Sequence, residues 1–394
     1  MRLHADWRKW PSAQSCRKRS LFRDAAEEVR TVEHRPFIPH TILIEAAVEH
    51  APLTRRVLER LPQASRLVVP EARPLLEPEG GQHGQGLLVL AEQRGRFVKP
   101  CPGTKDYICC GYLNLNVATG CTIGCDYCIL QSYLGWLNLT VFANTEQLWR
   151  ELDEFFTVQN RKAVRIGTGE LTDSLVFEHL VGLNEELIRY FADKKNALLE
   201  LKTKSGQVEG LLALNHGRRT VLSWSLNSEE VASLHEPGSA PVARRLEAAR
   251  LAQEAGYRLG FHFDPLIWYK GWQEGYAGVV DQVFSVIRPK NIAWISLGAL
   301  RYPPALDELI RARHPHCDLP LGELLPGRDG KFRYFRPLRE EMYRFVYNRI
   351  RRLAPDVLVY LCMESDVVWR RALGWSPGNS AGLARLLDER VFLP

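Results

Sequence analysis

Short apolar segments alternate with longer segments of helical spacing from about residue 112 to residue 300, and no other feature of the sequence constrains the fold as much. Each apolar segment has the length of a strand, and each segment between them is long enough to be a helix. This pattern is typical of βα units that build a parallel sheet. The region holds about six such units, too few for an eight-fold barrel. The sequence therefore predicts an α/β protein with a partial (β/α)6 barrel.

The predicted strands are apolar runs bounded by turn residues, and the predicted helices repeat apolar residues three or four positions apart. The strands cover residues 114–117, 163–167, 197–202, 220–226, 259–263 and 291–297. The helices cover residues 145–156, 176–191, 208–214, 241–255 and 276–287. The order of strands and helices indicates that the carboxyl ends of the strands meet at one edge, where barrels place their functional residues.

The sequence outside this region predicts further parts. A strand at 41–45, a helical segment at 46–62 and a strand at 67–69 indicate a small α/β unit, and the Pro- and Gly-rich residues 74–86 read as a linker or long loop. Helices at 303–313 and 337–353 flank a turn at 327–330. The expected domains are a polar N-terminal extension at 1–35, a small N-terminal α/β domain at 36–95, the barrel at 96–302 and a basic C-terminal helical cap at 303–394.

Composition excludes several classes of protein. Apolar residues make up 45% and charged residues 25% of the 394 residues, as in ordinary globular chains rather than disordered or collagen-like ones. No apolar run is long enough to span a bilayer. The N-terminus lacks the apolar segment of a signal peptide. We therefore expect a cytoplasmic protein without a membrane partner.

The cysteines point to metal or redox chemistry. There are nine, an odd number, and six of them lie between positions 101 and 128. An odd count in a long chain without a signal peptide argues against a disulfide framework. Clustering of thiols in a reducing compartment instead favours a metal site.

Cys121, Cys125 and Cys128 form a CxxxCxxC motif just after the first predicted barrel strand. Three thiolates on a short loop can hold three irons of a [4Fe–4S] cluster and leave the fourth iron without a protein ligand. Zinc would normally need a fourth ligand, and none follows at the usual spacing, so zinc or chance spacing is the weaker alternative. An open iron at a strand end is what a radical S-adenosylmethionine (SAM) enzyme requires, because the methionine part of SAM chelates that iron.

The sequence around this motif resembles the cluster loop of spore photoproduct lyases, radical SAM enzymes that repair a thymine–thymine lesion in DNA. The resemblance extends over about residues 36–350. It rests on Pro36-Phe37-Ile38-Pro39, Ala118-Thr119-Gly120-Cys121, Cys125-Asp126-Tyr127-Cys128-Ile129-Leu130-Gln131, Glu236-Pro237-Gly238, Arg244-Arg245-Leu246-Glu247, Leu259-Gly260-Phe261 and Glu274-Gly275-Tyr276. It implies a radical SAM barrel that holds a [4Fe–4S] cluster and SAM.

The resemblance also implies roles for single residues. Tyr127, which we count among the catalytic residues, would pack near the adenine of SAM. The cofactor-binding residues would be Glu170 for the methionine ammonium group, Thr172 for SAM, Lys204 for the SAM carboxylate, Ser225 and Asn227 for the ribose and methionine, and Asp264 near the adenine. A single lysine or serine at a strand end is usually structural. Here all of the proposed cofactor-binding residues follow predicted strands, where together they could surround a bound cofactor.

One position departs from the family pattern. The lyases carry a cysteine two residues before the position of Thr172, and it returns a hydrogen atom to the product radical. This chain has Glu170 there, in a stretch that looks like the Gly-Gly-Glu motif of radical SAM enzymes, whose carboxylate accepts the methionine ammonium. A carboxylate cannot donate a hydrogen atom as a thiol does. Another donor is therefore needed if the lyase mechanism holds.

Other thiols are candidates for that donor. They are Cys101, Cys109, Cys110 and Cys362, of which we assign Cys109 and Cys110 to the catalytic residues because they precede the cluster loop by about a dozen positions. Tyrosines could share this role. The alternatives are ordinary buried thiols and a second metal site.

A basic segment is the candidate for substrate binding. Residues 301–352 hold 12 basic and 7 acidic residues, and Lys331, Arg333, Tyr334 and Arg336 mix cations with aromatics. Cations neutralise phosphates, and aromatic faces stack on displaced bases. In the family, an Arg-Tyr pair separates the strands around the flipped lesion, and Arg333-Tyr334 resemble it. A solvated, charged helix face is the alternative.

These observations lead to three hypotheses. The first is a lyase that cleaves SAM reductively to a 5′-deoxyadenosyl radical and repairs a thymine dimer-type DNA lesion. The second, favoured by Glu170, is a radical SAM enzyme of the same scaffold that acts on RNA, a nucleotide or a peptide. The third is a non-catalytic DNA-binding iron–sulfur protein. As partners we expect DNA or another nucleic acid and an electron donor such as flavodoxin or ferredoxin, and we expect a monomer.

Overall fold

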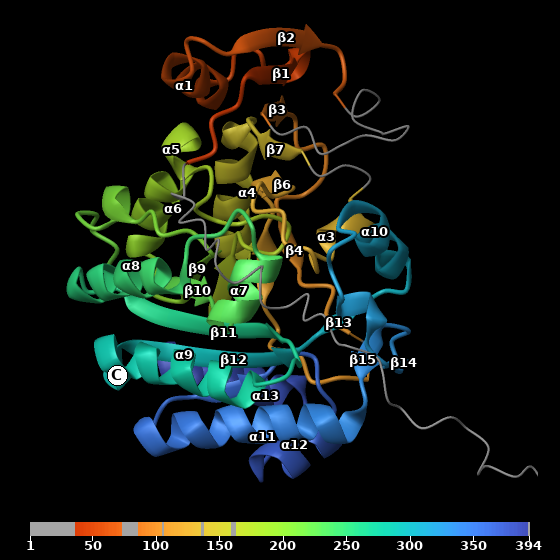
Figure 1. Ribbon diagram of the computed structural model, residues 1–394. Helices are drawn as coiled ribbons and strands as arrows, with labels where there is room; N and C mark the ends of the chain where they lie inside the picture. Colours follow the sequence, from red (N-terminus) through yellow and green to blue (C-terminus); the bar gives the residue numbers. More distant parts are fainter. Residues whose placement is uncertain (1–35, 73–85, 105, 135–137, 159–162, 393–394) are drawn as a thin grey trace, which may run out of the picture. The chain divides into compact units, whose positions relative to one another are not determined.

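The computed structural model describes residues 36–72, 86–104, 106–134, 138–158 and 163–392 (Figure 1). The chain divides into the units Met1–Arg35 and Pro36–Pro394. The predicted N-terminal extension at 1–35 lies outside the described residues, and so does the predicted linker at 74–86 except for Gly86.

An eight-stranded sheet forms the centre of the described unit, in the order β16-β12-β11-β10-β9-β8-β5-β4. Neighbouring strands are parallel from β5 to β16, and β4 pairs antiparallel with β5. The strands are β4 (Val98–Pro100), β5 (Leu113–Leu115), β8 (Val164–Gly167), β9 (Ala197–Thr203), β10 (Thr220–Ser225), β11 (Arg258–Leu266), β12 (Ile292–Ala299) and β16 (Val359–Leu361). All residues of β10 and β12 are buried, as in a parallel sheet covered on both faces. The predicted partial barrel is confirmed.

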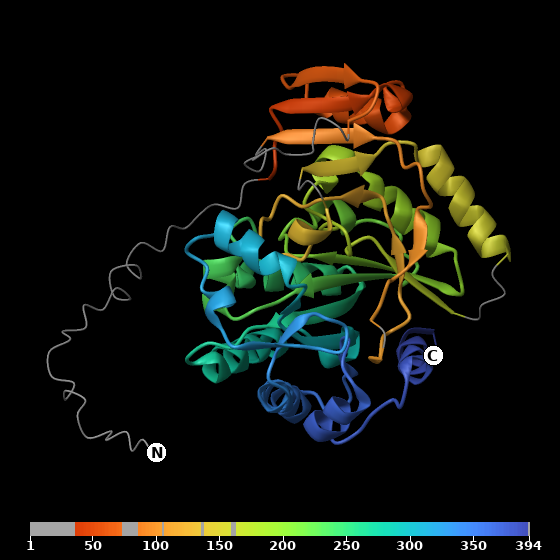
Figure 2. The same cartoon turned by 90° about the vertical axis from the view of Figure 1, so that its right-hand side faces the viewer.

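Helices connect the parallel strands and cover the sheet. α6 packs against β9, α8 against β10 and β11, and α11 and α13 against β12 (Figures 1 and 2). The helices are α4 (Thr145–Val158), α5 (Glu178–Val181), α6 (Leu183–Ala192), α7 (Glu229–His235), α8 (Val242–Glu254), α9 (Trp272–Val286), α11 (Arg336–Leu353), α12 (Asp366–Leu373) and α13 (Ser380–Phe392). The 3-10 helices are η2 (Ala46–Val48), η3 (Glu209–Leu211), η4 (Pro289–Asn291) and η5 (Leu319–Leu321).

Two helices predicted in the barrel region differ from the structure, and the helical segment predicted at 46–62 divides into η2 and α1 (Pro52–Arg60). The helix predicted at 176–191 is interrupted at Gly182, whose φ of 64° lies in the left-handed region and ends α5 before α6 begins. The helix predicted at 208–214 is wrong, because only the single turn η3 forms there. The apolar residues Val208 and Leu211, whose spacing suggested a helix, are instead buried in an irregular connection.

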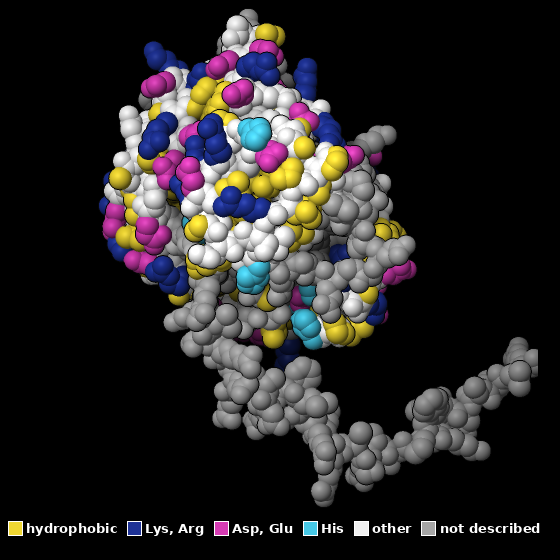
Figure 3. All heavy atoms as spheres, turned by 90° about the horizontal axis from the view of Figure 1, so that it is seen from above, with side chains coloured by type: hydrophobic (Ala, Val, Ile, Leu, Met, Phe, Trp, Pro, Cys, Tyr) yellow, Lys and Arg dark blue, Asp and Glu magenta, His cyan; other side chains and the backbone are white. Residues whose placement is uncertain are grey.

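A second sheet has five strands in the order β2-β1-β3-β7-β6. Its strands are β1 (Thr41–Glu45), β2 (Ser65–Val69), β3 (Leu87–Ala91), β6 (Ala118–Thr119) and β7 (Leu139–Phe142), and α1 (Pro52–Arg60) packs against α5. β6 and β7 come from beyond residue 96, so the small N-terminal sheet is completed by strands that flank the cluster loop. The predicted domain boundaries stay predictions. Seen from above, the described part of this end mixes cationic and anionic side chains rather than presenting one basic face (Figure 3).

The C-terminal region contributes strands as well as helices. β16 adds a strand beyond the predicted end of the sheet, and a small antiparallel sheet follows the carboxyl end of β12 (Figure 1). This sheet contains β13 (Arg301–Tyr302), β15 (Phe332–Tyr334) and β14 (Leu324–Pro326), and α10 (Ala305–Arg313) packs against α3 (Leu130–Tyr133). The predicted turn at 327–330 joins β14 to β15. Among the described residues, no helix has the length and apolar character needed to cross a membrane.

Candidate functional site

The three cysteines of the CxxxCxxC motif lie on a tight loop between β6 and α3. Gly120 and Gly124 have φ values of 80° and 67°, which favour glycine, and they let the loop turn on either side of Cys121. The backbone N–H of Cys128 donates to the carbonyl of Cys125 at 3.0 Å. Burial raises the pKa of the Cys121 thiol to about 12, so a metal that binds here displaces its proton.

The end of α7 and the Glu236-Pro237-Gly238 segment after it contact this loop through backbone hydrogen bonds. The N–H of Gly238 donates to the carbonyl of Ile123 at 2.9 Å, and the N–H of Asp126 donates to the carbonyl of His235 at 3.0 Å. A Cβ on Gly238 would lie 2.6 Å from the Ile123 oxygen, so a larger residue would push the loop away. This close backbone contact explains why glycine occupies position 238.

A buried ion pair fixes Tyr127 beside the loop. The Tyr127 hydroxyl donates to Glu236, whose other oxygen lies 2.5 Å from the Arg245 guanidinium. Although burial raises the pKa of Glu236, the charges of Arg245 and Lys204 lower it below its ordinary value. Arg245 also donates to the carbonyl of Ser225 at 2.9 Å, which ties the end of β10 to the same network.

The three thiols open onto a cavity of about 170 Å³. Its opposite wall is built from residues at the carboxyl ends of β8, β9, β10 and β11. The predicted site residues that line it are Cys121, Cys125, Cys128, Glu170, Thr172, Lys204, Ser225 and Asp264. The structure therefore brings together the predicted metal ligands and most of the predicted cofactor residues.

The residues of this cavity suit SAM. Thr172 is buried, and its hydroxyl oxygen has no hydrogen-bond partner among the described residues, so it is available to a ligand. A Cβ on Gly169 would lie 2.8 Å from the Lys202 Cβ, so only glycine lets the backbone at position 169 lie this close to Lys202. The cavity also offers a carboxylate, Glu170, for an ammonium group and an ammonium, Lys204, for a carboxylate. A methionine zwitterion needs both.

Asp173 and Lys202 are among the cavity residues that were not predicted from the sequence. Asp173 accepts hydrogen bonds from the N–H groups of Leu175 and Lys204, at 2.9 and 2.6 Å, and so joins the loop after β8 to the end of β9. Lys202 lies 3.9 Å from Glu170. Although burial lowers the pKa of Lys202, the carboxylate of Glu170 raises it above its ordinary value. The Leu-Thr-Asp order was the sequence signal that could have identified Asp173.

A second cavity of about 280 Å³ adjoins the first, because Cys128, Glu170, Ser225 and Asp264 line both. Its other lining residues are Cys101, Cys110, Tyr112, Tyr127, Glu200, Lys202, His262, Arg301, Lys331, Tyr360 and Cys362, among others. Burial raises the pKa of Cys101 to about 12 and also raises the pKa values of Cys110 and Cys362. These thiols are therefore protonated at neutral pH.

Charged pairs form part of the wall of the second cavity. Arg301 makes a two-fold ion pair with Asp264, at 2.9 and 3.0 Å. Glu200 accepts from His262 at 2.9 Å and from Ser223 at 2.5 Å. Although burial raises the pKa of Glu200, His262 lowers it to about 2, so this carboxylate stays ionised inside the barrel.

Several predicted residues lie outside the lining of both cavities. Asn227 is buried and accepts from the Tyr276 hydroxyl at 2.5 Å. Cys109 lies beside Thr104, with its sulfur 4.0 Å from the carbonyl oxygen. Arg333 is 2% exposed and pairs with Asp329 at 2.7 Å.

The predicted substrate segment divides between buried and exposed side chains. Tyr334 is buried, and its hydroxyl accepts from the N–H of Trp268 at 3.1 Å. Lys331 lines the second cavity. Arg336 is half-exposed and pairs with Glu340 at 3.5 Å, and Phe335 beside it is exposed. Phe335 and Arg336 are therefore the exposed members of this segment, whereas Lys331 has 15% of its side chain exposed and lies 4.0 Å from Asp329.

Comparisons with known proteins identify the family. The family model described as spore photoproduct lyase matches residues 109–358, more than half of the chain. Spore photoproduct lyase of Bacillus subtilis strain 168 is 28% identical over 210 residues, which cover 52% of this chain and 61% of that protein. The lyase of Geobacillus sp. is 23% identical over 301 residues, which cover 73% of this chain and 86% of that protein.

Solved structures share the fold. A spore photoproduct lyase complexed with dinucleoside spore photoproduct has a TM-score of 0.74 and 23% identity, covering 83% of this chain and all of the other. A mutant of the lyase with bound AdoMet and dinucleoside spore photoproduct gives the same TM-score, 0.74, at 23% identity. Together with the family match, these findings show that the chain belongs to the spore photoproduct lyase family of the radical SAM superfamily.

Proposed function

We propose that this chain binds a [4Fe–4S] cluster through Cys121, Cys125 and Cys128, binds SAM beside it, and repairs a thymine dimer-type lesion in DNA. When bound, the cluster and SAM supply a 5′-deoxyadenosyl radical by reductive cleavage. The observation that carries the proposal is the cavity in which the three thiols face residues from the ends of four barrel strands. Solved members of the family, as their names state, bind AdoMet and dinucleoside spore photoproduct.

The chain's own residues would hold SAM by complementary charge. Glu170 would accept the methionine ammonium group, and Lys204 would neutralise the methionine carboxylate. The unpaired hydroxyl of Thr172 and the side chain of Ser225 would hydrogen-bond the ligand. Asn227 would act through its neighbours, because it is buried against Tyr276 outside the cavity. The Tyr127–Glu236–Arg245 network would keep the wall of this site rigid.

The hydrogen-atom donor would be one of the thiols in the second cavity. Cys101, Cys110 and Cys362 line it together with Glu170, which stands where the family has its donor cysteine. Burial keeps all three protonated, and an S–H bond is what hydrogen-atom transfer needs. Cys109 is a weaker candidate than we expected from the sequence, because it does not line either cavity.

DNA would be recognised at the entrance to the second cavity. Lys331 lines that cavity, and Phe335 and Arg336 are exposed where α11 begins. A cation for the phosphate and an aromatic face for a displaced base are the groups this task requires. Arg333 and Tyr334 would instead shape the β14–β15 hairpin, because both are buried and paired. We expect an electron donor such as flavodoxin or ferredoxin, and a monomeric enzyme.

A repair assay tests this proposal. The reduced protein, with SAM, is incubated with a dinucleotide that contains the spore lesion, and the dinucleotide with two restored thymines is quantified by chromatography. We expect repair, and we expect one of Cys101→Ser, Cys110→Ser and Cys362→Ser to keep SAM cleavage while losing most of the repair. Cys109→Ser is the matched control and should repair the lesion. If SAM is cleaved but the lesion persists in every sample, DNA lesion repair is the wrong function.

One observation favours a second candidate function. Glu170 replaces the donor cysteine at a position where a carboxylate cannot supply a hydrogen atom. A radical SAM enzyme of this fold that acts on RNA, a nucleotide or a peptide would not need that thiol. Continued SAM cleavage without lesion repair, stimulated by one of these substrates, would support it.

A further inference from the structure

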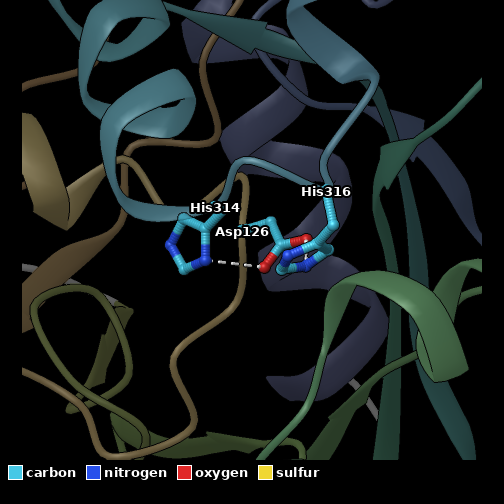
Figure 4. A group of neighbouring side chains, drawn as sticks. All are labelled: Asp126, His314 and His316. Carbon is cyan, nitrogen blue, oxygen red and sulfur yellow. Dashed lines mark ion pairs between the residues drawn. The ribbon is translucent and has the colours of Figure 1, made fainter.

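Asp126 lies between two cysteines of the cluster loop and is surrounded by a second group of metal-binding side chains. His235 ends α7, and His314, His316 and Cys317 follow α10. The imidazoles of His314 and His316 lie on either side of the Asp126 carboxylate (Figure 4). These residues come from three segments that are far apart in the sequence. None of them belongs to the CxxxCxxC triplet.

The ligand atoms form two groups that share Asp126, one with His235 and Cys317 and one with His314 and His316, and within each group they lie within 4.8 Å of one another. His235 Nδ1 lies 3.0 Å from Asp126 Oδ2, and His314 Nδ1 lies 3.0 Å from Asp126 Oδ1. His316 Nε2 lies 3.3 Å from Asp126 Oδ2, and the Cys317 sulfur lies 3.8 Å from His235 Nδ1. A tetrahedral zinc ion separates its ligand atoms by roughly 3.3 Å for nitrogen and oxygen and by roughly 3.6 Å for nitrogen and sulfur.

Burial and missing hydrogen bonds also point to a ligand. The side chain of Asp126 is 1% exposed, and its Oδ1 has no hydrogen bond among the described residues, although His314 faces it. His235 and Cys317 are buried as well. A carboxylate and imidazoles placed this close without full hydrogen bonding would be costly unless a cation joined them.

We propose that Asp126, His235 and Cys317 bind one zinc ion, with His314 as the fourth ligand. Imidazole, thiolate and carboxylate are the donors that zinc prefers, and four protein ligands make a closed structural site. His316 is exposed on 65% of its side chain and is the alternative fourth ligand. The soft sulfur and two nitrogens argue against magnesium or calcium, which take oxygen ligands.

The zinc ion would join the C-terminal region to the cluster loop. Asp126 is adjacent to Cys125, and His314 also lines the cavity in front of the cluster. Only one other polar side-chain contact among the described residues joins α10 to α3 and its loop: Arg313 donates to Gln131 at 3.5 Å. A four-ligand site would therefore hold the wall of the first cavity in place far more firmly than this hydrogen bond. Its role is structural.

Metal analysis of the purified holoprotein tests the site. We expect about one zinc ion per chain in addition to the iron of the cluster. Zinc should remain when Cys121, Cys125 and Cys128 are all replaced by Ala, which separates this site from zinc bound by the cluster cysteines. Cys317→Ser and His235→Ala should lower zinc affinity by at least about 100-fold. His216→Ala, a buried histidine outside the group, is the matched control and should keep its zinc.

Zinc X-ray absorption on the wild-type protein covers the case in which a ligand variant does not fold. We expect a first shell of one sulfur with nitrogen and oxygen ligands. His314→Ala and His316→Ala identify the fourth ligand, because only one of them should lose zinc. Zinc bound to three or four sulfurs, or a wild-type protein that takes up no zinc, would overturn the proposal. A wild-type protein that takes up no zinc but still releases 5′-deoxyadenosine would refute this site alone, so this site and the proposed function fail independently.

Discussion

Replacing Glu236 by Gln should cost about 3 to 5 kcal/mol of unfolding free energy, because the change leaves a buried cation without its counter-charge. The side chains of Arg245 and Glu236 are 0% and 1% exposed, and their charged atoms lie 2.5 Å apart. The remaining hydrogen bonds of Arg245, to the carbonyls of Ala240 and Ser225 and to the Ser239 hydroxyl, are to neutral groups and cannot balance the charge. Lys204 nearby would also lose part of its counter-charge, although the carboxylate of Asp173 would remain.

Denaturant unfolding followed by circular dichroism measures this cost. The matched control is Glu247→Gln on α8, which breaks an exposed pair with Arg250 and should leave the unfolding free energy unchanged. The double variant Glu236→Leu with Arg245→Met removes both charges and should be less destabilised than Glu236→Gln. A loss below about 1 kcal/mol for Glu236→Gln would refute the account of this network as a buried, rigid support for the cluster loop.

Three further predictions follow from single contacts. Gly238→Ala should displace the cluster loop, because the new Cβ would lie 2.6 Å from the Ile123 oxygen. We expect the unfolding free energy to fall by about 1 to 3 kcal/mol and the protein to hold less iron per chain after reconstitution. A normal iron content would contradict this prediction. Thr172→Val should weaken SAM binding roughly fivefold, measured by calorimetry, without changing stability, since the hydroxyl has no partner in the protein. The carboxylate of Glu200 has its pKa lowered from 4.5 to about 2 by His262, so the stability it contributes is present above pH 4.5 and is lost as the pH falls from 4.5 to 2. Glu200→Gln should flatten that part of the stability profile, and an unchanged slope would contradict the assignment.

Much of the fold could be predicted from the sequence because local patterns determine it. The alternation of apolar strands and amphipathic helices predicted the parallel sheet, and β9, β10 and α8 begin and end within a residue or two of the predicted limits. The interruption at Gly182 could not be predicted, because a glycine inside an apolar helical pattern is often tolerated. β16 was missed because its three residues are too short to form a pattern of their own.

The candidate site, like the fold, could be predicted only where local sequence patterns determine it. The three cysteines of the motif and most of the candidate SAM-binding residues do line one cavity, because a compact motif and the ends of strands locate them. Cys101, Cys110 and Cys362 meet in one cavity only through the tertiary fold, and sequence spacing favoured Cys109 instead. Arg333 shows how the tertiary fold can weaken a prediction made from neighbouring residues. Its neighbours in the sequence suggested a phosphate contact, but the turn before β15 pairs it with Asp329 and buries it.

Release of 5′-deoxyadenosine tests the central claim most directly. The protein is reconstituted with iron and sulfide under nitrogen, reduced with dithionite and supplied with SAM, and the product is quantified by liquid chromatography and mass spectrometry. The account predicts 5′-deoxyadenosine from the wild-type protein and none from Cys125→Ala. No product from a wild-type protein that holds about four irons per chain, or equal product from both proteins, would contradict it.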